Sequence, residues 1–153
     1  MIVQNQMETV KISPIENQNP RVKFWYPQYS NISLDAQIGK GTTIHSHVWI
    51  ADNVIVGENC RIEAFAFLPG GVILEDNVFI GPHVCFTNDR KPPSDKWDTI
   101  TVQNGAKIGA NASILAGVTI GEDALVGMGS VVLKDVPAGE VWAGNPAKFI
   151  KKL

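Results

Sequence analysis

Large apolar residues recur at every sixth position along most of this chain. The first series runs through Ile32, Ile38, Ile44, Ile50, Val56, Ile62, Leu68, Leu74, Ile80 and Phe86, and a second register runs through Val102, Ile108, Ile114, Ile120, Val126 and Val132. Four residues after nearly every lead position stands a small or β-branched residue, and glycine, asparagine or aspartate is frequent in between. The pattern therefore predicts one short structural unit that is repeated along the chain.

A strict period of six excludes the two commonest regular structures. An α-helix turns every 3.6 residues, so a stripe with this period would rotate around its surface. Consecutive β-hairpins would need turn residues at every reversal of the chain. The period fits a parallel β-helix, in which each hexad supplies one short strand and one corner. We therefore predict an all-β solenoid over residues 32–136, with each strand pairing to the coils above and below it.

The repeat is absent at both ends of the chain and at one internal segment. Residues 1–31 are expected to cap the first coil, and residues 137–153 to form a short basic C-terminal helix or tail. Between Phe86 and Val102 the turn-forming residues of "TNDRKPPSD" interrupt the register. They predict a loop over about 87–101 that is extruded from one corner and carries Trp97 outward. The chain is otherwise predicted to be a single domain, residues 1–153.

Composition and charge narrow the class of protein. The chain has 153 residues, of which 44% are hydrophobic and 18% charged, as in an ordinary folded domain. A net charge of −2 gives no reason to expect nucleic acid or an anionic membrane as a partner. Neither a membrane span nor a signal peptide is visible, so we expect a cytoplasmic protein. Its two cysteines, Cys60 and Cys85, are expected to be structural.

Two long segments carry a family resemblance. "IGKGTTIHSHVWIADNVIVGENCRI" and "GAKIGANASILAGVTIGEDALVGMGSVVLKDVPAGEVWAGNPAK" are similar to the hexapeptide-repeat acyltransferases. The resemblance covers residues 30–150. It implies a left-handed parallel β-helix with three hexads per triangular coil, assembled as a homotrimer with active sites between subunits. Residues 18 apart would then stack above one another, as in the column of His47, Phe65 and His83.

The donor side of the reaction is implied by "GSVVLKDVP" and "GNPAK", which resemble the acetyl-CoA segment of these enzymes. The resemblance implies acetyl-CoA as cosubstrate, contacted by Ala110, Met128, Leu133, Lys134, Lys148 and Lys151. Small residues let the pantetheine amides reach the backbone, and lysines meet the phosphates as point charges. Met128 and Leu133 depart from the alanine and threonine that are usual in the family. The alternative for Lys148 and Lys151 is a solvated basic tail.

The acceptor side is implied by "VFIGPHVCFTNDRKPPS", which resembles N-acetyltransferases of nucleotide-linked 3-amino sugars. This resemblance implies that Asn88 and Asp89 orient the acceptor, although Pro93 replaces a usual arginine. Sugar O-acetyltransferases carry a histidine near this place, because a hydroxyl must lose its proton to a base. An amine needs mainly orientation. The residues therefore favour N-acetylation, with O-acetylation as the alternative.

His83 and Glu63 complete the candidate acceptor site. His83 either accepts a proton or binds the acceptor, or it merely hydrogen-bonds a neighbouring coil. Glu63 lies where similar enzymes place a polar residue near the acceptor, and its alternative is a solvated carboxylate. No covalent nucleophile stands out, so we expect direct attack on the thioester, with backbone amides of the later coils holding its oxygen.

Two further classes of function stay open. A γ-carbonic-anhydrase-like zinc protein would use His47 and His83, but its third ligand position falls at Asn88, a poor zinc ligand, so no metal is expected. A non-catalytic scaffold would not need the donor segment. The sequence thus predicts an acetyl-CoA-dependent N-acetyltransferase that acts on a UDP- or dTDP-linked amino sugar for surface polysaccharide biosynthesis.

Overall fold

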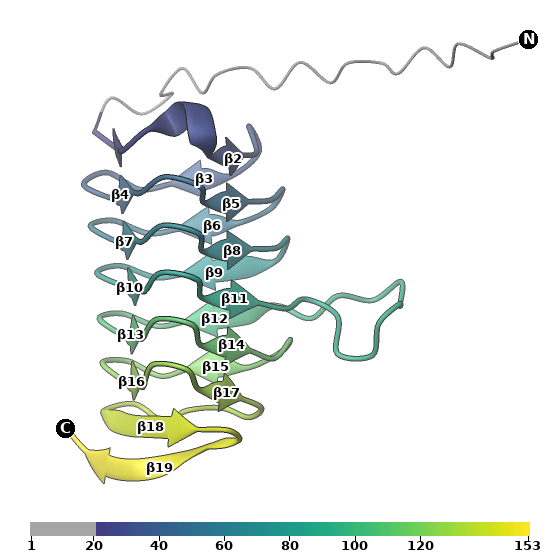
Figure 1. Ribbon diagram of the computed structural model, residues 1–153, viewed down its shortest axis with the longest axis vertical. Helices are drawn as coiled ribbons and strands as arrows, with labels where there is room; N and C mark the ends of the chain where they lie inside the picture. Colours follow the sequence, from purple (N-terminus) through teal and green to yellow (C-terminus); the bar gives the residue numbers. More distant parts are fainter. Residues whose placement is uncertain (1–20) are drawn as a thin grey trace, which may run out of the picture.

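The computed structural model describes residues 21–153, which form a triangular solenoid of short parallel strands (Figure 1). The first face contains β1 (Lys23–Phe24), β4 (Thr43–Ile44), β7 (Arg61–Ile62), β10 (Phe79–Ile80), β13 (Lys107–Ile108), β16 (Leu125–Val126), β18 (Glu140–Gly144) and β19 (Ala147–Lys152). The second face contains β2 (Asn31–Ile32), β5 (Trp49–Ile50), β8 (Phe67–Leu68), β11 (Cys85–Phe86), β14 (Ser113–Ile114) and β17 (Val131–Val132). The third face contains β3 (Gln37–Ile38), β6 (Ile55–Val56), β9 (Val72–Leu74), β12 (Ile100–Val102) and β15 (Thr119–Ile120). A 3-10 turn, η1 (Pro27–Tyr29), lies in the first coil.

The predicted all-β parallel solenoid is confirmed, and it is consistent with the left-handed β-helix that the resemblance implies. Residues 18 apart pair in register, as Trp49 does with Phe67. Across the loop the paired residues are 28 apart instead, as with Cys85 and Ser113. The loop is therefore an insertion into a scaffold that continues unchanged on both sides.

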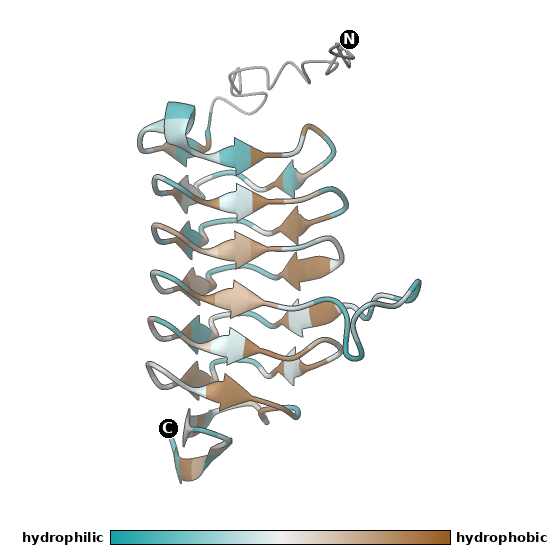
Figure 2. Ribbon diagram, turned by 45° about the vertical axis from the view of Figure 1, so that its right-hand side comes forward, coloured by the Kyte–Doolittle hydropathy of each residue, from teal (hydrophilic) through white to brown (hydrophobic). Residues whose placement is uncertain are grey.

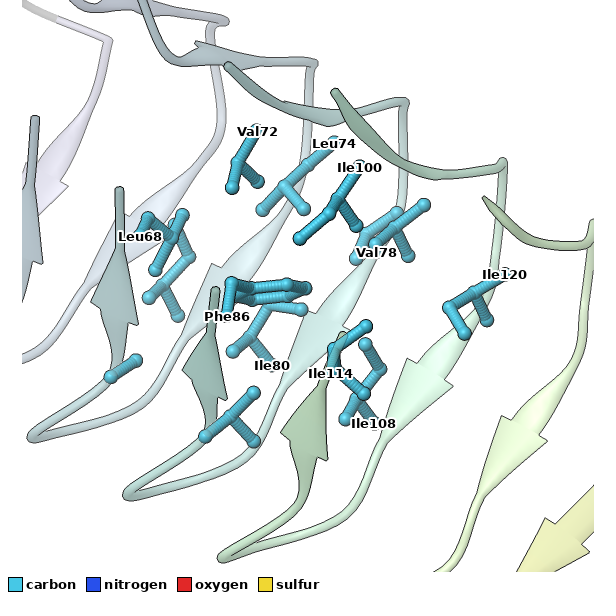
Figure 3. Close-up of a cluster of buried hydrophobic side chains, with 14 of the residues drawn as sticks. Leu68, Val72, Leu74, Val78, Ile80, Phe86, Ile100, Ile108, Ile114 and Ile120 are labelled. Carbon is cyan, nitrogen blue, oxygen red and sulfur yellow. The ribbon is translucent and has the colours of Figure 1, made fainter. Parts of the chain in front are cut away.

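The lead residues of the hexads form the core. Ile44, Ile62 and Ile108 are fully buried, and Ile38 of the first complete coil is only partly so. Figure 3 shows lead residues of the middle coils, such as Leu74, Ile80 and Ile108, pointing into the space between the three faces, with Phe86 near the middle. Burial of such side chains contributes about 1.5–3 kcal/mol each. The hydrophobic hexad positions thus hold the coils together.

The extruded loop spans Thr87–Thr99, two residues shorter at its end than predicted, because β12 already begins at Ile100. Ile100 is buried and pairs with Val72 of β9. It therefore belongs to the strand, in which buried and partly buried residues alternate. The loop is polar along most of its length, whereas the neighbouring strands combine apolar and polar residues (Figure 2). Its two ends are joined by a hydrogen bond from Asp98 N to Asn88 O of 2.9 Å.

The C-terminal segment was expected to be a short helix or tail, and this expectation is wrong. Residues 140–152 form an antiparallel hairpin of β18 and β19, and β18 also pairs in parallel with β16. The last coil leaves an edge of unpaired backbone groups, and a strand can satisfy these groups where a helix cannot. Trp142 of β18 is buried against the end of the core.

At the other end the solenoid begins earlier than predicted. Strand β1 pairs with β4, so the first coil starts at Lys23 rather than at Ile32. Residues 1–20 of the predicted cap lie outside the described residues. Within the described part of the chain, no helix has the length and apolar character needed to cross a membrane.

Candidate active site

Two corners of the solenoid flank the second face and carry the candidate residues. The groove corner joins the first face to the second and comprises residues 45–47, 63–65, 81–83, 109–111 and 127–129. The loop corner joins the second face to the third and comprises residues 51–53, 69–71, 87–89, 115–117 and 133–135. His83 and Asn88 therefore lie at opposite ends of β11, on different corners of one chain.

Asn88 lines a pocket of about 500 Å³ at the loop corner. Its Nδ2 lies 3.4 Å from Gly70 O, a long hydrogen bond that leaves most of the amide's capacity for a ligand. The coil holds the start of the loop firmly, because Thr87 Oγ1 donates to Ile114 O and accepts from Ala116 N. The Asn88 side chain is thus presented from a rigid part of the scaffold.

Trp97 forms one wall of the same pocket. The loop was predicted to carry Trp97 outward, and the side chain is indeed 67% exposed. The indole nevertheless lies over Gly70 and lines the pocket with it. A Cβ placed on Gly70 would lie 3.8 Å from the indole ring, an ordinary van der Waals distance, and 3.1 Å from Asp52 O, so the tight contact is with backbone of the preceding coil. Nothing in the hexad pattern predicts that Trp97 lies over Gly70.

The charge of the pocket is negative. Asp52 and Asp98 line it, and no lysine, arginine or histidine is among its described lining residues. Asp52 also accepts a hydrogen bond from Ser33 Oγ. A phosphate would be repelled here, whereas an ammonium group or a neutral amine would be attracted. An aromatic wall beside carboxylates and an amide suits a small, partly apolar ring that bears an amine.

Asp89 is placed differently from Asn88. Its carboxylate accepts hydrogen bonds from Lys91 N, Ser94 N and Ser94 Oγ at 2.9, 2.7 and 3.0 Å, and it is not among the pocket residues. Desolvation acts to raise the pKa of Asp89, but these hydrogen bonds outweigh it and hold the pKa below its ordinary value. The carboxylate therefore organises the loop, and its role toward an acceptor stays a prediction.

His83 ends a stack of rings on the groove corner. The ring stack consists of Tyr29, His47, Phe65 and His83, one from each successive coil. Its centroids are separated by 5.2, 4.7 and 4.7 Å, with interplanar angles of 11°, 19° and 5°. His83 does not line the Asn88 pocket of its own chain.

Glu63 lies beside the ring stack on the same corner. Its carboxylate pairs with Arg61 Nε at 2.6 Å and with His45 Nε2 at 3.6 Å, and 16% of its side chain is exposed. These two partners satisfy it within the chain, so Glu63 is not the solvated carboxylate of the alternative. Its contact with an acceptor stays a prediction.

A groove of about 270 Å³ follows the groove corner on the C-terminal side of His83. Ala110 and Met128, two of the predicted donor residues, line it together with Phe79, Lys107 and Leu125. The coils approach closely here: a Cβ on Gly109 would lie 2.6 Å from Met128 N. The coil that carries Ala110 lies next to the coil that carries His83, because Asn111 N donates to Pro82 O at 2.9 Å.

The other predicted donor residues lie elsewhere on the chain. Leu133 and Lys134 follow β17 on the loop corner, with Lys134 Nζ 5.0 Å from the Trp142 ring centroid. Lys148 and Lys151 lie exposed on β19. Within one chain, the predicted donor residues therefore lie in three separate places: the groove corner, the loop corner and the hairpin.

Neither cysteine has the character of a nucleophile. Cys60 is buried, and its Sγ donates to Glu75 O at 3.0 Å. Burial raises the pKa of both Cys60 and Cys85, so both thiols stay protonated at neutral pH. Transfer without an acyl-enzyme stays a prediction.

The residues of the zinc alternative are not brought together within the chain. His47 and His83 are held apart by the Phe65 ring, and Asn88 lies on the other corner. Among residues 21–153, no three histidine, cysteine, aspartate or glutamate side chains gather as a metal site would require.

Comparisons with known proteins agree with this architecture. The chain belongs to the hexapeptide-repeat transferases: the family described as "Bacterial transferase hexapeptide (six repeats)" matches residues 53–88 and 99–134. The provisionally named acetyltransferase YJL218W of Saccharomyces cerevisiae is 34% identical over 117 residues, which are 71% of this chain and 57% of that protein.

Two further relatives carry names that specify an amine acceptor. The 2,3,4,5-tetrahydropyridine-2,6-dicarboxylate N-acetyltransferase of Staphylococcus aureus is 43% identical over 76 residues, or 50% of this chain and 31% of that one. A mutant of GDP-perosamine N-acetyltransferase from Caulobacter crescentus, in complex with CoA and GDP-perosamine, superposes with a TM-score of 0.74 at 25% identity. That match covers 86% of this chain and 58% of the other. The chain therefore spans between about a third and three fifths of these relatives.

Proposed function

We propose that this protein transfers an acetyl group from acetyl-CoA to the amine of a nucleotide-linked amino sugar. The observation that carries the proposal is the pocket around Asn88, whose described lining residues offer an amide, two carboxylates and an indole wall but no histidine, the usual base for a hydroxyl acceptor. Such a lining holds and orients an amine, whereas a hydroxyl acceptor would need a base to take its proton. The N-acetyltransferases among the related proteins support the same chemistry.

The complete site is proposed to form between the subunits of a homotrimer. The second face joins the two corners and exposes Trp49 and Phe67, which are 46% and 39% exposed and in ring contact at 6.3 Å. If three copies pack these apolar faces around one axis, the loop corner of one copy faces the groove corner of the next. Asn88 of one subunit would then meet His83 and the Ala110–Met128 groove of its neighbour.

The proposed reaction is a direct displacement. The groove holds the pantetheine arm, while Asn88 orients the amine toward the thioester carbon. The N–C bond forms as the C–S bond breaks, and the thiolate of CoA leaves. The proton lost by the amine passes to His83 or to the departing thiolate, and backbone N–H groups of the later coils hold the thioester oxygen.

O-acetylation remains the second candidate, because His83 of a neighbouring subunit could act as the base for a hydroxyl. The two candidates are separated by measuring thiol release from acetyl-CoA with matched sugar nucleotides that carry either an amine or a hydroxyl at the same carbon. We expect turnover with the amines alone. Turnover with the hydroxyl compounds alone would reverse the assignment.

The intersubunit site has its own test. Asn88→Ala and His83→Ala chains are unfolded, mixed and reassembled, and thiol release is measured. If the site lies between subunits, some mixed trimers pair an intact Asn88 with an intact His83, and activity returns. If both residues served one site within a chain, mixing would restore nothing. The nucleotide, the cytoplasmic location and the role in surface polysaccharide synthesis stay predictions.

A further inference from the structure

Phe65 occupies a backbone conformation that its side chain disfavours. Its φ is +63°, in the left-handed region that is costly for bulky residues and mild for asparagine, aspartate and glycine. Most positive-φ corner residues outside the groove corner follow that preference: Asn53, Asn59, Asn77 and Asp123. His47 and His83 hold the same conformation, but histidine is itself enriched there, so Phe65 is the member of the ring stack with positive φ that departs from the preference.

Burial does not account for the departure. The Phe65 side chain is 49% exposed, whereas the lead residues that hold the coils together are fully buried. What the ring does contact is an imidazole on each side, with centroids at 4.7 Å from His47 and from His83. The geometry is closest to parallel on the His83 side, at 5°.

The Phe65 ring is also the only side chain of the described residues that fixes the His83 imidazole by a specific contact. No hydrogen bond or ion pair to that imidazole occurs within residues 21–153, and the side chain is exposed. A freely rotating imidazole would place its nitrogens badly for proton transfer, which needs a hydrogen-bond distance to the reacting group. His83 ends the ring stack on the coil next to the one that carries Ala110 of the groove, so its orientation matters there.

We propose that Phe65 is a positioning residue that holds the plane of the His83 imidazole on the coil next to the Ala110–Met128 groove. The backbone cost of a phenylalanine at this corner is retained because the ring serves the acceptor reaction rather than the fold. This inference rests on the proposed function, since it assigns His83 a part in the transfer. In this proposal Phe65 acts through His83.

The variants that test the proposal are Phe65→Asn, Phe65→Tyr and, as a matched control, Tyr26→Asn. Tyr26 is also an exposed aromatic residue with a left-handed backbone (φ +58°), but its ring contact is with Tyr29 and not with a histidine. Phe65→Asn is expected to fold with an unchanged or raised Tm and to lose about tenfold in kcat, with the KM for acetyl-CoA unchanged. The Phe65→Tyr protein, which keeps an aromatic ring, should keep the wild-type kcat, and so should the Tyr26→Asn protein.

A spectroscopic measurement separates this proposal from the proposed function. The ring protons of His83 lie over the Phe65 face, so their NMR signals carry a ring-current shift in the wild-type protein. Phe65→Asn should move them to the positions of a solvent-exposed imidazole, and Phe65→Tyr should not. Unmoved His83 signals, or moved signals with unchanged kcat, would overturn the positioning role. A wild-type protein that stacks the rings but acetylates no acceptor would overturn the proposed function and this role with it.

Discussion

Replacing Asn88 by alanine should separate catalysis from folding more clearly than any other change. The substitution removes one hydrogen bond, from Nδ2 to Gly70 O at 3.4 Å, which is longer than the usual range. A hydrogen bond of good geometry contributes about 0.5–1.5 kcal/mol to stability, so this one contributes about 0.5 kcal/mol. The hydrogen bond from Asp98 N to Asn88 O is kept, since it involves only the backbone.

The expected loss of activity is much larger. A group that orients the attacking amine is worth about a hundredfold in kcat/KM for the acceptor, or about 2.7 kcal/mol of transition-state stabilisation. The Tm should fall by about 2 °C. Thiol release at varied acceptor concentration measures the first quantity, and scanning calorimetry measures the second.

A matched control removes a similar side-chain hydrogen bond at a place away from the pocket. Asn104 Oδ1 accepts from Asp76 N at 3.1 Å on the remaining corner of the solenoid. Asn104→Ala should therefore lower the Tm at least as much as Asn88→Ala while leaving kcat/KM unchanged. The reasoning is refuted if Asn88→Ala collapses the Tm while the remaining folded protein keeps its activity.

Three other predictions concern the core, the groove and the loop. Ile62→Ala should cost about 2–5 kcal/mol in the free energy of unfolding, because a fully buried side chain leaves a cavity, and a loss below 1 kcal/mol in urea denaturation would contradict the core assignment. Ala110→Trp should raise the KM for acetyl-CoA at least tenfold with little change in the acceptor KM, and equal effects on both would argue against the groove as the donor site. Because the folded-state pKa of Asp89 is lowered, its contribution to loop order is present above the ordinary value of 3.8 and is lost as the pH falls through the lowered value. An acid titration of Trp97 fluorescence should show that transition, and Asp89→Asn should remove it.

The scaffold was predictable from the sequence because the hexad pattern records one physical constraint many times. Ile44 and Ile62 each point inward for the same reason, and the many equivalent positions establish the repeat even where one position is ambiguous. The C-terminal hairpin was missed because it does not repeat. Its strand β18 forms only because the last coil needs a partner for its edge, and that requirement is visible in the tertiary structure alone.

The sequence suggested candidate site residues but not their arrangement. Ala110 and Met128 line one groove and Asn88 lines a pocket, while their roles toward donor and acceptor stay predictions. The corner on which each residue falls follows from the register, yet the part of Trp97 in the pocket depends on how the loop folds back over Gly70. That fold is set by long-range hydrogen bonds, such as Arg90 to Ala116 O, which leave no periodic trace in the sequence.

The ring stack shows a different limit of prediction from the sequence. The 18-residue spacing places His47, Phe65 and His83 in one column, but spacing alone leaves open whether their side chains touch. The left-handed backbone at each position accompanies the mutual contact of the rings, and at Phe65 that conformation runs against residue preference. A prediction from preference would have placed asparagine there.

A competition experiment tests the central claim most directly. The protein is incubated with labelled acetyl-CoA and an equimolar mixture of one sugar nucleotide in two forms, with an amine or a hydroxyl at the same carbon. The labelled product is separated from acetyl-CoA and treated with alkaline hydroxylamine, which cleaves acetate esters and leaves acetamides intact. We predict a labelled product that resists hydroxylamine. Label that is released by hydroxylamine would show that the acceptor is a hydroxyl and would contradict the assignment.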